Sequence, residues 1–402
     1  MGGHLVIAGG SIKGDVIYKK FVELAGGGAG RIAIVPTGTG DANETLLDYI
    51  KVFEACDVKS DNIIGIKINP DINTNDEWKK CGDDFENFDF LKDVKGVWFT
   101  GGDQVRIIKG FLRDDGTDTK ILKKIKCILD TGGVIGGSSA GAAIMSEIMI
   151  GGGTSLGALS LPECTDYAEY RRKPELEENG VLLITKGLGF LKSTVIDQHF
   201  NKRGRLGRLI EVLFSKNINI GYGISEDSAI VYSIEEATVS AIGTGGVTIL
   251  NISAASKSKI GNYSKFVNLE LSYLEEGDVY DVNEDKFYLK TRDEISDNEY
   301  NACKKYLSNI LFMPNSDFER FNVKLKADEY EPVLNYSNEK KMRYVKNYEF
   351  TNEETGYEIS LYNKKGFIQE IISRNYSFVK VTMDILPVML KSSTLQEFAK
   401  QK

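Results

Sequence analysis

The chain has 402 residues, 42 % of them hydrophobic, which is enough material for two domains with sizeable cores. Its 58 acidic residues outnumber the 50 basic ones, and the net charge of −8 argues against a general nucleic-acid binder, because phosphate binding needs basic patches. The apolar runs are too short to span a bilayer, we find no secretion signal, and five scattered cysteines without a CxxC pair indicate reduced thiols in a cytoplasm.

Short β-branched runs alternate with helical patterns along the first 141 residues. The expected strands are HLVIAGG (4–10), RIAIVPTGTG (31–40), NIIGIKI (62–68), GVWFTGGDQ (96–104) and GVIGGSSAG (133–141). The expected helices are VIYKKFVELA (16–25), NETLLDYIKVFEAC (43–56) and KILKKIKCILDTGG (120–133). This alternation predicts an α/β fold with a mostly parallel sheet sandwiched by helices. Ligands of such sheets gather beyond the carboxyl ends of the strands.

Further strands are expected at STVIDQHF (193–200), DSAIVYS (227–233), TVSAIGTG (238–245) and GVTILNI (246–252), the last few antiparallel. Only two of the 41 glycines lie after residue 290, so the composition changes between about 275 and 295. We therefore expect a catalytic domain over 1–288 and a C-terminal α+β extension over 289–402. In the extension we predict a helix from Asn298 to Phe312 and a hairpin around Asn363 to Gly366.

The strongest local motif is Gly137-Ser138-Ser139-Ala140-Gly141, which follows a strand and precedes the apolar run AAIMSEIM. A G-x-S-x-G sequence between a strand and a helix is typical of a nucleophile elbow, in which a sharp turn exposes the serine hydroxyl. The helix behind it supplies free N–H groups for an oxyanion. A glycine-rich turn without catalysis is equally compatible with the pentapeptide alone.

A second motif, Thr100-Gly101-Gly102-Asp103-Gln104, also ends a strand. Paired glycines let a backbone approach a substrate closely. An N–H of Gly102 or Asp103 could complete an oxyanion hole with that of Ala140, and Gln104 could bind a substrate amide or carboxylate. In isolation, a plain turn with an aspartate cap is the more common interpretation.

The third motif is Asp197-Gln198-His199, with arginines following at 203, 205 and 208. The chain has two histidines, and His4 begins the first strand far from any motif, so His199 is the credible general base. Two histidines also leave little room for a metal site, and we expect neither metal nor cofactor. The arginines could converge on a carboxylate, although their spacing equally fits a solvated basic helix start.

The last motif, Gly223-Ile224-Ser225-Glu226-Asp227, enters another strand. Glu226 could orient His199, which gives the chain order nucleophile, base, acid. This order differs from that of α/β-hydrolases, in which the acid precedes the histidine. Asp197 remains an alternative partner for the base.

Together these motifs resemble the cyanophycinases, serine exopeptidases related to peptidase E, or aspartyl dipeptidase, on a class I glutamine amidotransferase-like fold. The resemblance covers about residues 3–285, and DQHF with its spaced arginines is its most specific element, since peptidase E lacks that array. It implies that Ser139 is the nucleophile, His199 the base and Glu226 the orienting acid. It also implies a substrate pocket, which is lined by Gln104, Asp197, Arg203, Arg205 and Arg208.

The resemblance further implies that the substrate is cyanophycin, a poly-aspartate whose side chains carry arginine through isopeptide bonds, and that β-Asp-Arg dipeptides are released. Asp197 is the candidate acidic group for the substrate guanidinium, and a homodimer is expected. A peptidase E-like α-aspartyl dipeptidase and a catalytically silent cyanophycin-binding protein remain alternatives. The extension resembles nothing in the family; an oligomerisation or packing appendage is favoured over a granule-binding module.

Overall fold

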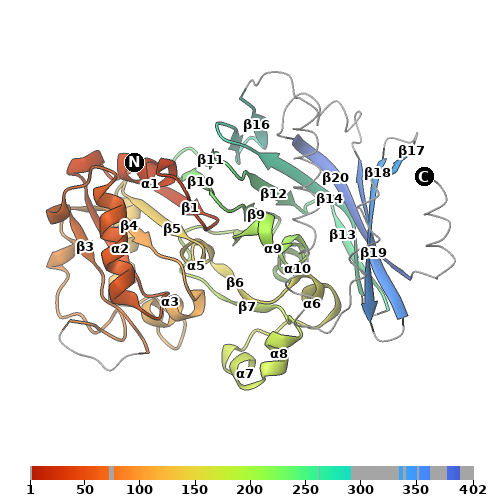
Figure 1. Cartoon of the computed structure of the whole chain (residues 1–402), viewed down its shortest axis with the longest axis horizontal. Helices are drawn as coiled ribbons and strands as arrows, with labels where there is room; N and C mark the ends of the chain where they lie inside the picture. The colour runs from red at the N-terminus through yellow and green to blue at the C-terminus, as the bar shows by residue number, and fades with distance from the viewer. Residues whose placement is uncertain are drawn as a thin grey trace.

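In the computed structural model, two β-sheets lie side by side, with helices over them (Figure 1). The structure describes residues 2–71, 77–261, 263–290, 335–337, 341–350, 353–362 and 378–389. Every described helix is too short or too polar to span a lipid bilayer.

The first sheet has nine strands, in the order β16-β15-β11-β10-β1-β5-β4-β2-β3. Their bounds are β1 (His4–Ala8), β2 (Arg31–Val35), β3 (Ile63–Gly65), β4 (Val94–Phe99), β5 (Val134–Ser138), β10 (Ser228–Ser233), β11 (Thr238–Gly243), β15 (Val279–Asp281) and β16 (Lys286–Tyr288). The five neighbouring strands β1-β5-β4-β2-β3 are parallel to one another. The strands β10, β11, β15 and β16 extend the sheet beyond β1 with antiparallel pairing.

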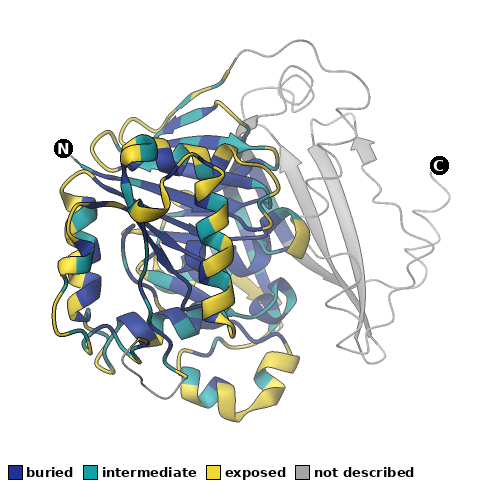
Figure 2. Cartoon of the chain, turned by 60° about the vertical axis from the view of Figure 1, so that its left-hand side comes forward, coloured by how far each residue is buried: buried dark blue, intermediate teal, exposed yellow. Residues whose placement is uncertain are grey.

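Helices cover both faces of this first sheet. Their bounds are α1 (Val16–Leu24), α2 (Ala42–Glu54), α3 (Gln104–Phe111), α4 (Lys120–Asp130) and α5 (Ala140–Ala143). Along β1, Val6 and Ala8 pack with the helices α1 and α2, while Leu5 and Ile7 pack with α3, α4 and α5. This alternation explains why the strands are apolar on both faces, and Figure 2 shows the buried strands beneath helices whose outer faces are exposed.

The second sheet follows the order β17-β18-β19-β20-β14-β12-β9-β8, with β13 paired to β14. Its strands are β8 (Thr194–Asp197), β9 (Ile220–Ile224), β12 (Val247–Asn251), β13 (Ser256–Ile260), β14 (Tyr263–Leu274), β17 (Asn335–Ser337), β18 (Lys341–Phe350), β19 (Glu353–Tyr362) and β20 (Phe378–Met389). Only β8 and β9 pair in parallel within it. One face shares the core of the first sheet through Tyr222 and Ile249, and the other packs on α10.

The remaining elements connect the two sheets. They are the pair β6 (Ile148–Gly152) and β7 (Leu183–Lys186), the helices α6 (Ser155–Ser160), α7 (Tyr167–Arg172), α8 (Pro174–Glu178), α9 (Phe200–Arg203) and α10 (Leu206–Lys216), and the short 3₁₀ turns η1 (Gly27–Ala29), η2 (Ser60–Asn62) and η3 (Asp89–Leu91).

The predicted α/β class is confirmed, and the predicted parallel pairing holds for the five strands β1-β5-β4-β2-β3. Beyond these strands most pairs are antiparallel. For β10 and β11, and for β13 and β14, the reason is that the connections between them are too short for a crossover. The helix expected after Ser139 is a single turn. It ends at Ala143, after which the backbone of Ile144, Met145 and Glu147 bonds to residues 187–191.

The C-terminal extension contributes β17 to β20 to the second sheet. Its strand β20 pairs with β14, and Met383 and Ile385 are buried against α10 and β14. The predicted helix from Asn298 to Phe312 lies outside the described residues. The turn around Asn363 to Gly366 also lies outside them, immediately after β19 ends at Tyr362.

Candidate active site

The end of β1 holds three distant segments of the chain through three consecutive carbonyls. The N–H groups of Ser139, His199 and Asp227 donate to the carbonyls of Ala8 (3.1 Å), Gly9 (2.8 Å) and Gly10 (2.9 Å), respectively. Backbone hydrogen bonds of this length are well formed. The predicted nucleophile, base and acid segments are therefore positioned by one strand end.

Ser139 lies between β5 and α5 with φ 56° and ψ −111°, a conformation that side-chain-bearing residues rarely adopt. The flanking glycines permit the turn: a Cβ on Gly137 would lie 2.3 Å from the carbonyl oxygen of Gly141, and one on Gly141 would lie 2.2 Å from that of Phe99. This is the sharp strand-to-helix turn that the pentapeptide predicts.

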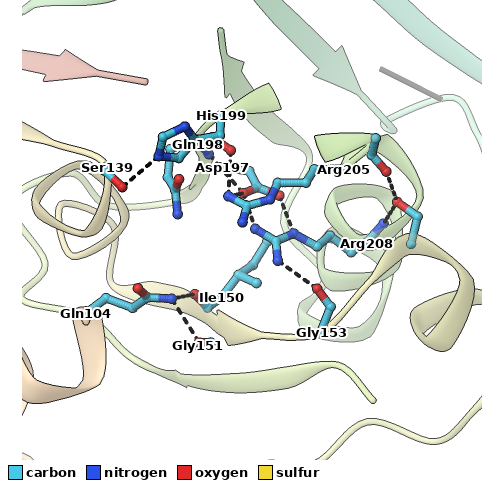
Figure 3. A network of polar contacts seen from close by, with 12 residues as sticks. Gln104, Ser139, Ile150, Gly151, Gly153, Asp197, Gln198, His199, Arg205 and Arg208 are labelled. Carbon is cyan, nitrogen blue, oxygen red and sulfur yellow. Dashed lines mark hydrogen bonds and ion pairs between the residues drawn. The ribbon is translucent and has the colours of Figure 1, made fainter. Parts of the chain in front are cut away.

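Ser139, His199 and Glu226 form a continuous hydrogen-bonded series. The Oγ of Ser139 lies 2.8 Å from Nε2 of His199, and Nδ1 of His199 lies 2.7 Å from Oε1 of Glu226. Figure 3 shows the serine hydroxyl directed at the imidazole. Glu226, rather than Asp197, is the carboxylate on His199.

Two features hold the acid and the base in this geometry. His199 immediately precedes α9, in the left-handed conformation with φ 49°, and its side chain is 8 % exposed. The Oδ1 of Asn201 accepts the backbone N–H of Glu226 at 3.0 Å. Sequence reasoning did not single out Asn201, because nothing in the pattern distinguishes it from an ordinary helix residue.

The environment of His199 favours its neutral form. Burial lowers the pKa of His199, the hydrogen bond that His199 donates to Glu226 opposes this, and the positive charges of Arg203 and Arg205 lower the pKa further. A neutral imidazole near neutral pH can accept a proton from Ser139.

The second motif lies beside the serine. A Cβ on Gly101 would be 3.5 Å from Cβ of Ser139. The N–H groups of Gly102 and Ala140 make no hydrogen bond with another described residue, whereas the N–H of Asp103 donates to the Gly38 carbonyl at 2.8 Å. The expectation for Asp103 therefore changes, because its N–H is already bonded to the neighbouring loop; the N–H groups of Gly102 and Ala140 are the remaining candidate oxyanion donors.

Two of the three predicted arginines converge on a carboxylate of the protein itself, that of Asp197. Arg208 is buried and makes a bidentate ion pair with Asp197, at 2.7 Å through Nε and 2.6 Å through Nη2, while its Nη1 donates to the Gly153 carbonyl (Figure 3). Arg205 donates to the Gln198 carbonyl at 2.6 Å and lies 3.5 Å from Asp197. Asp197 is 1 % exposed, so its carboxylate serves these arginines rather than a substrate guanidinium.

The remaining predicted binding residues differ in how many of their polar groups are already bonded within the protein. Gln104 donates its amide to the carbonyls of Ile150 (3.3 Å) and Gly151 (2.8 Å), which anchors α3 to β6. Arg203 is exposed and makes no ion pair with another described residue. Gln198 is buried beside His199, and its Oε1 has no hydrogen-bond partner among the described residues.

Gly10 is a further site residue that sequence reasoning missed. Its φ is +107°, and a Cβ there would lie 2.4 Å from Cε1 of His199. The signal in the sequence is the Gly-Gly pair at the end of the first expected strand, HLVIAGG (4–10).

The geometry can support nucleophilic attack by an activated serine, with the base oriented by a carboxylate. Within the described ranges, no three His, Cys, Asp or Glu side chains gather as they would around a metal ion.

The chain is similar to several known proteins. A cyanophycinase from Geminocystis herdmanii is 29 % identical over 284 residues, covering 69 % of this chain and 92 % of that protein. One from Trichormus variabilis is 29 % identical over 250 residues, covering 61 % and 72 %. A crystal structure of a peptidase from an acI-B1 Actinobacterium is 18 % identical, with a TM-score of 0.43, and covers 62 % of this chain and 91 % of that one. Because the model of peptidase family S51 matches residues 5–240, more than half of the chain, this protein belongs to that family and is a peptidase.

Proposed function

We propose that this chain is a serine-type exopeptidase that hydrolyses cyanophycin to β-Asp-Arg dipeptides through an acyl-enzyme. The observation that carries the proposal is the hydrogen-bonded series of Ser139, His199 and Glu226, with the positive charge of Arg203 and Arg205 beside it. The two curated relatives described above are cyanophycinases, which supports the polymer as substrate.

In the first half of the reaction, the Oγ of Ser139 attacks the backbone carbonyl of an aspartyl residue while Nε2 of His199 takes the hydroxyl proton. Glu226 accepts the Nδ1–H of His199 and stabilises the imidazolium. The N–H groups of Gly102 and Ala140 bind the oxyanion, and each donor of this kind is worth about 3–4 kcal/mol of barrier.

In the second half, the imidazolium gives its proton to the leaving amine as the C–N bond breaks, which leaves an ester on Ser139. The leaving amine is that of the terminal β-Asp-Arg unit. Water then attacks the ester, with His199 as base, and the shortened polymer leaves with a new terminal carboxylate.

The charged groups near the triad suggest how the chain end is selected. We assign the terminal carboxylate of the polymer to Arg203 and Arg205, and a substrate amide to the Oε1 of Gln104, whose Nε2 is held by β6. Asp197 and Arg208 are positioning residues in this proposal, since their ion pair is buried and fixes where Arg205 lies.

The test is mass spectrometry of the products after incubation with purified cyanophycin. Wild type should release β-Asp-Arg and label with a fluorophosphonate probe, whereas Ser139→Ala should do neither. Ser138→Ala is the matched control, because this adjacent serine makes no side-chain hydrogen bond with His199 in the described structure, and it should label normally. Normal dipeptide release by Ser139→Ala would overturn the proposal.

Other outcomes identify the alternatives. Cleavage of Asp-Leu-type dipeptides without cleavage of the polymer would indicate a peptidase E-like dipeptidase. Polymer binding without probe labelling or cleavage would indicate a silent binding protein.

We also propose that the protein acts in the cytoplasm as a homodimer. Cys56, Cys81, Cys127 and Cys164 are free thiols, which supports a reducing compartment. Light scattering of the purified full chain tests the dimer, and a monomeric mass at micromolar concentration would contradict it.

A further inference from the structure

A second polar cavity lies between α3 and α7, apart from the Ser139–His199 pair. Its volume is about 460 Å³. It is lined by Asp71, Asp103, Arg106, Lys109, Tyr167, Ala168 and Arg171. The two helices lie on the same lower side of the molecule in Figure 1, and the Nζ of Lys109 sits 4.9 Å from the ring centroid of Tyr167.

The cavity carries three cations and two carboxylates. Arg106 is paired with Asp71 at 2.7 Å. Lys109 and Arg171 make no ion pair with another described residue, and the contact of Lys109 with an aromatic face leaves its N–H donors available. Two cations are therefore free to bind a carboxylate from a ligand.

Asp103 supplies the complementary negative group. Its Oδ1 accepts the N–H groups of Val105 and Arg106 at the start of α3, while its Oδ2 makes no hydrogen bond with a described residue. Asp103, Tyr167 and Arg171 line the same cavity. Burial raises the pKa of the Tyr167 phenol, and the charge of Asp103 raises it further while Arg171 opposes it. The lining suits a ligand that carries both a carboxylate and a guanidinium.

The cavity is within a few residues' reach of the nucleophile. Gly101 lies against Ser139 and is two positions before Asp103. Because consecutive Cα atoms are about 3.8 Å apart, the Cα atoms of Gly101 and Asp103 are separated by at most about 8 Å. An extended polymer advances about 3.5 Å per backbone residue. A chain cleaved at Ser139 can therefore reach the cavity with a unit two or three positions from the scissile bond.

We propose that this cavity is a second subsite that binds the arginyl side arm of a neighbouring polymer unit, with its α-carboxylate on Lys109 and Arg171 and its guanidinium on Asp103. This inference rests on the proposed function, since it assumes a substrate with repeated zwitterionic side arms. The subsite would favour long chains over short ones.

The test compares kcat/KM for a long cyanophycin chain with kcat/KM for the shortest cleavable oligomer. An exposed charge pair contributes up to about fivefold in affinity. The double variant Lys109→Ala/Arg171→Ala should therefore lower the long-to-short ratio about tenfold, mainly through KM for the long chain. The double variant Lys123→Ala/Lys124→Ala removes two exposed cations from α4, outside the cavity, and should keep the wild-type ratio.

The outcomes separate this inference from the proposed function. If wild type cleaves the polymer and the Lys109→Ala/Arg171→Ala variant keeps its long-to-short ratio, the subsite is wrong and the proposed function stands. If both double variants lower the ratio equally, the effect is one of net charge and the subsite is again wrong. If wild type cleaves neither substrate, the proposed function itself fails.

Discussion

Gly10 lies directly against the imidazole of His199, so closely that a Cβ at this position would sit 2.4 Å from Cε1 and 2.6 Å from Nε2 of the ring. The backbone of the same strand end binds the N–H groups of His199 and Asp227. The His199 ring can occupy this position because Gly10, about 190 positions earlier in the chain, has no side chain.

Gly10→Ala should displace the His199 ring from Ser139. Misplacing a catalytic group by about 1 Å can cost about 100-fold, so kcat should fall by about this factor with little change in KM. The measurement is steady-state kinetics together with the rate of fluorophosphonate labelling.

Gly14→Ala is the matched control, because a Cβ there meets nothing within 4 Å, and it should retain wild-type kinetics. A positive φ also strains alanine at position 10, so the folded fraction must be checked by thermal unfolding. A well-folded Gly10→Ala protein with unchanged kcat would contradict the positioning role.

The pH dependence should report the state of His199. Burial lowers the pKa of His199 from its ordinary value of 6.5, and protonation removes the base. We therefore expect kcat/KM to rise with pH through a midpoint below 6.5 and to be fully developed at neutral pH. A midpoint above this value would contradict the burial argument.

Arg203→Ala should move that midpoint to higher pH, because the charge of Arg203 lowers the pKa of His199. The effect should shrink at high salt, since Arg203 is exposed and its field is screened. Lys202→Ala removes an adjacent exposed cation that does not act on His199, so its midpoint should match wild type. Equal shifts in the two variants would indicate a general charge effect.

Much of the candidate triad could be predicted from the sequence because its signals are local. The pentapeptide around Ser139 contains its own turn, and His199 stands out because the chain has only two histidines. The contact of Gly10 with His199 could not be predicted, since it depends on which strand lies next to β5 and on how far each strand extends.

The positions and partners of the three arginines could not be predicted from their spacing. Their spacing fits one helix turn, but Gly204 adopts a left-handed conformation with φ 52° and separates α9 from α10. Arg203 therefore ends one helix, Arg205 precedes the next and Arg208 lies within it. Arg205 and Arg208 both contact Asp197, whereas Arg203 makes no ion pair with another described residue. The partner of Arg208 is Asp197 on another element, which spacing cannot reveal.

The Asp197–Arg208 pair should be essential for stability. Arg208→Met would leave the carboxylate of Asp197 buried without its principal partner, and breaking a buried pair in this way costs about 3–5 kcal/mol. Urea unfolding measures the loss. Adding Asp197→Leu should recover much of it, since the uncompensated charge is then removed.

Arg203→Ala serves as the control for this pair, because an exposed arginine should change the free energy of unfolding by less than about 0.5 kcal/mol. If Arg208→Met were as stable as Arg203→Ala, the buried pair would not contribute as described.

The C-terminal extension is joined to the second sheet in a way that composition alone did not indicate. Its strand β20 pairs with β14 more than 100 residues earlier, in a register that joins Met383 to Leu269 and Ile385 to Phe266. Both β20 side chains are almost fully buried in the core that contains α10, the helix that carries Arg208. Glycine content marks a boundary near 290, but it says nothing of where the later strand returns.

Ile385→Ala should therefore destabilise the whole protein, although it lies far along the extension. Burial to 1 % exposure means that the substitution leaves a cavity beside Phe266, and such losses cost about 2–5 kcal/mol. Ile260→Ala is the matched control on the adjacent strand β13, where the side chain is 52 % exposed and the change should stay within about 0.5 kcal/mol. Urea unfolding followed by tryptophan fluorescence compares the two, because Trp98 lies in the first sheet and reports on its unfolding. If Ile385→Ala unfolds at the wild-type urea concentration, β20 is a peripheral attachment; if it unfolds earlier in one transition, the strand is part of the same cooperative unit as the peptidase site.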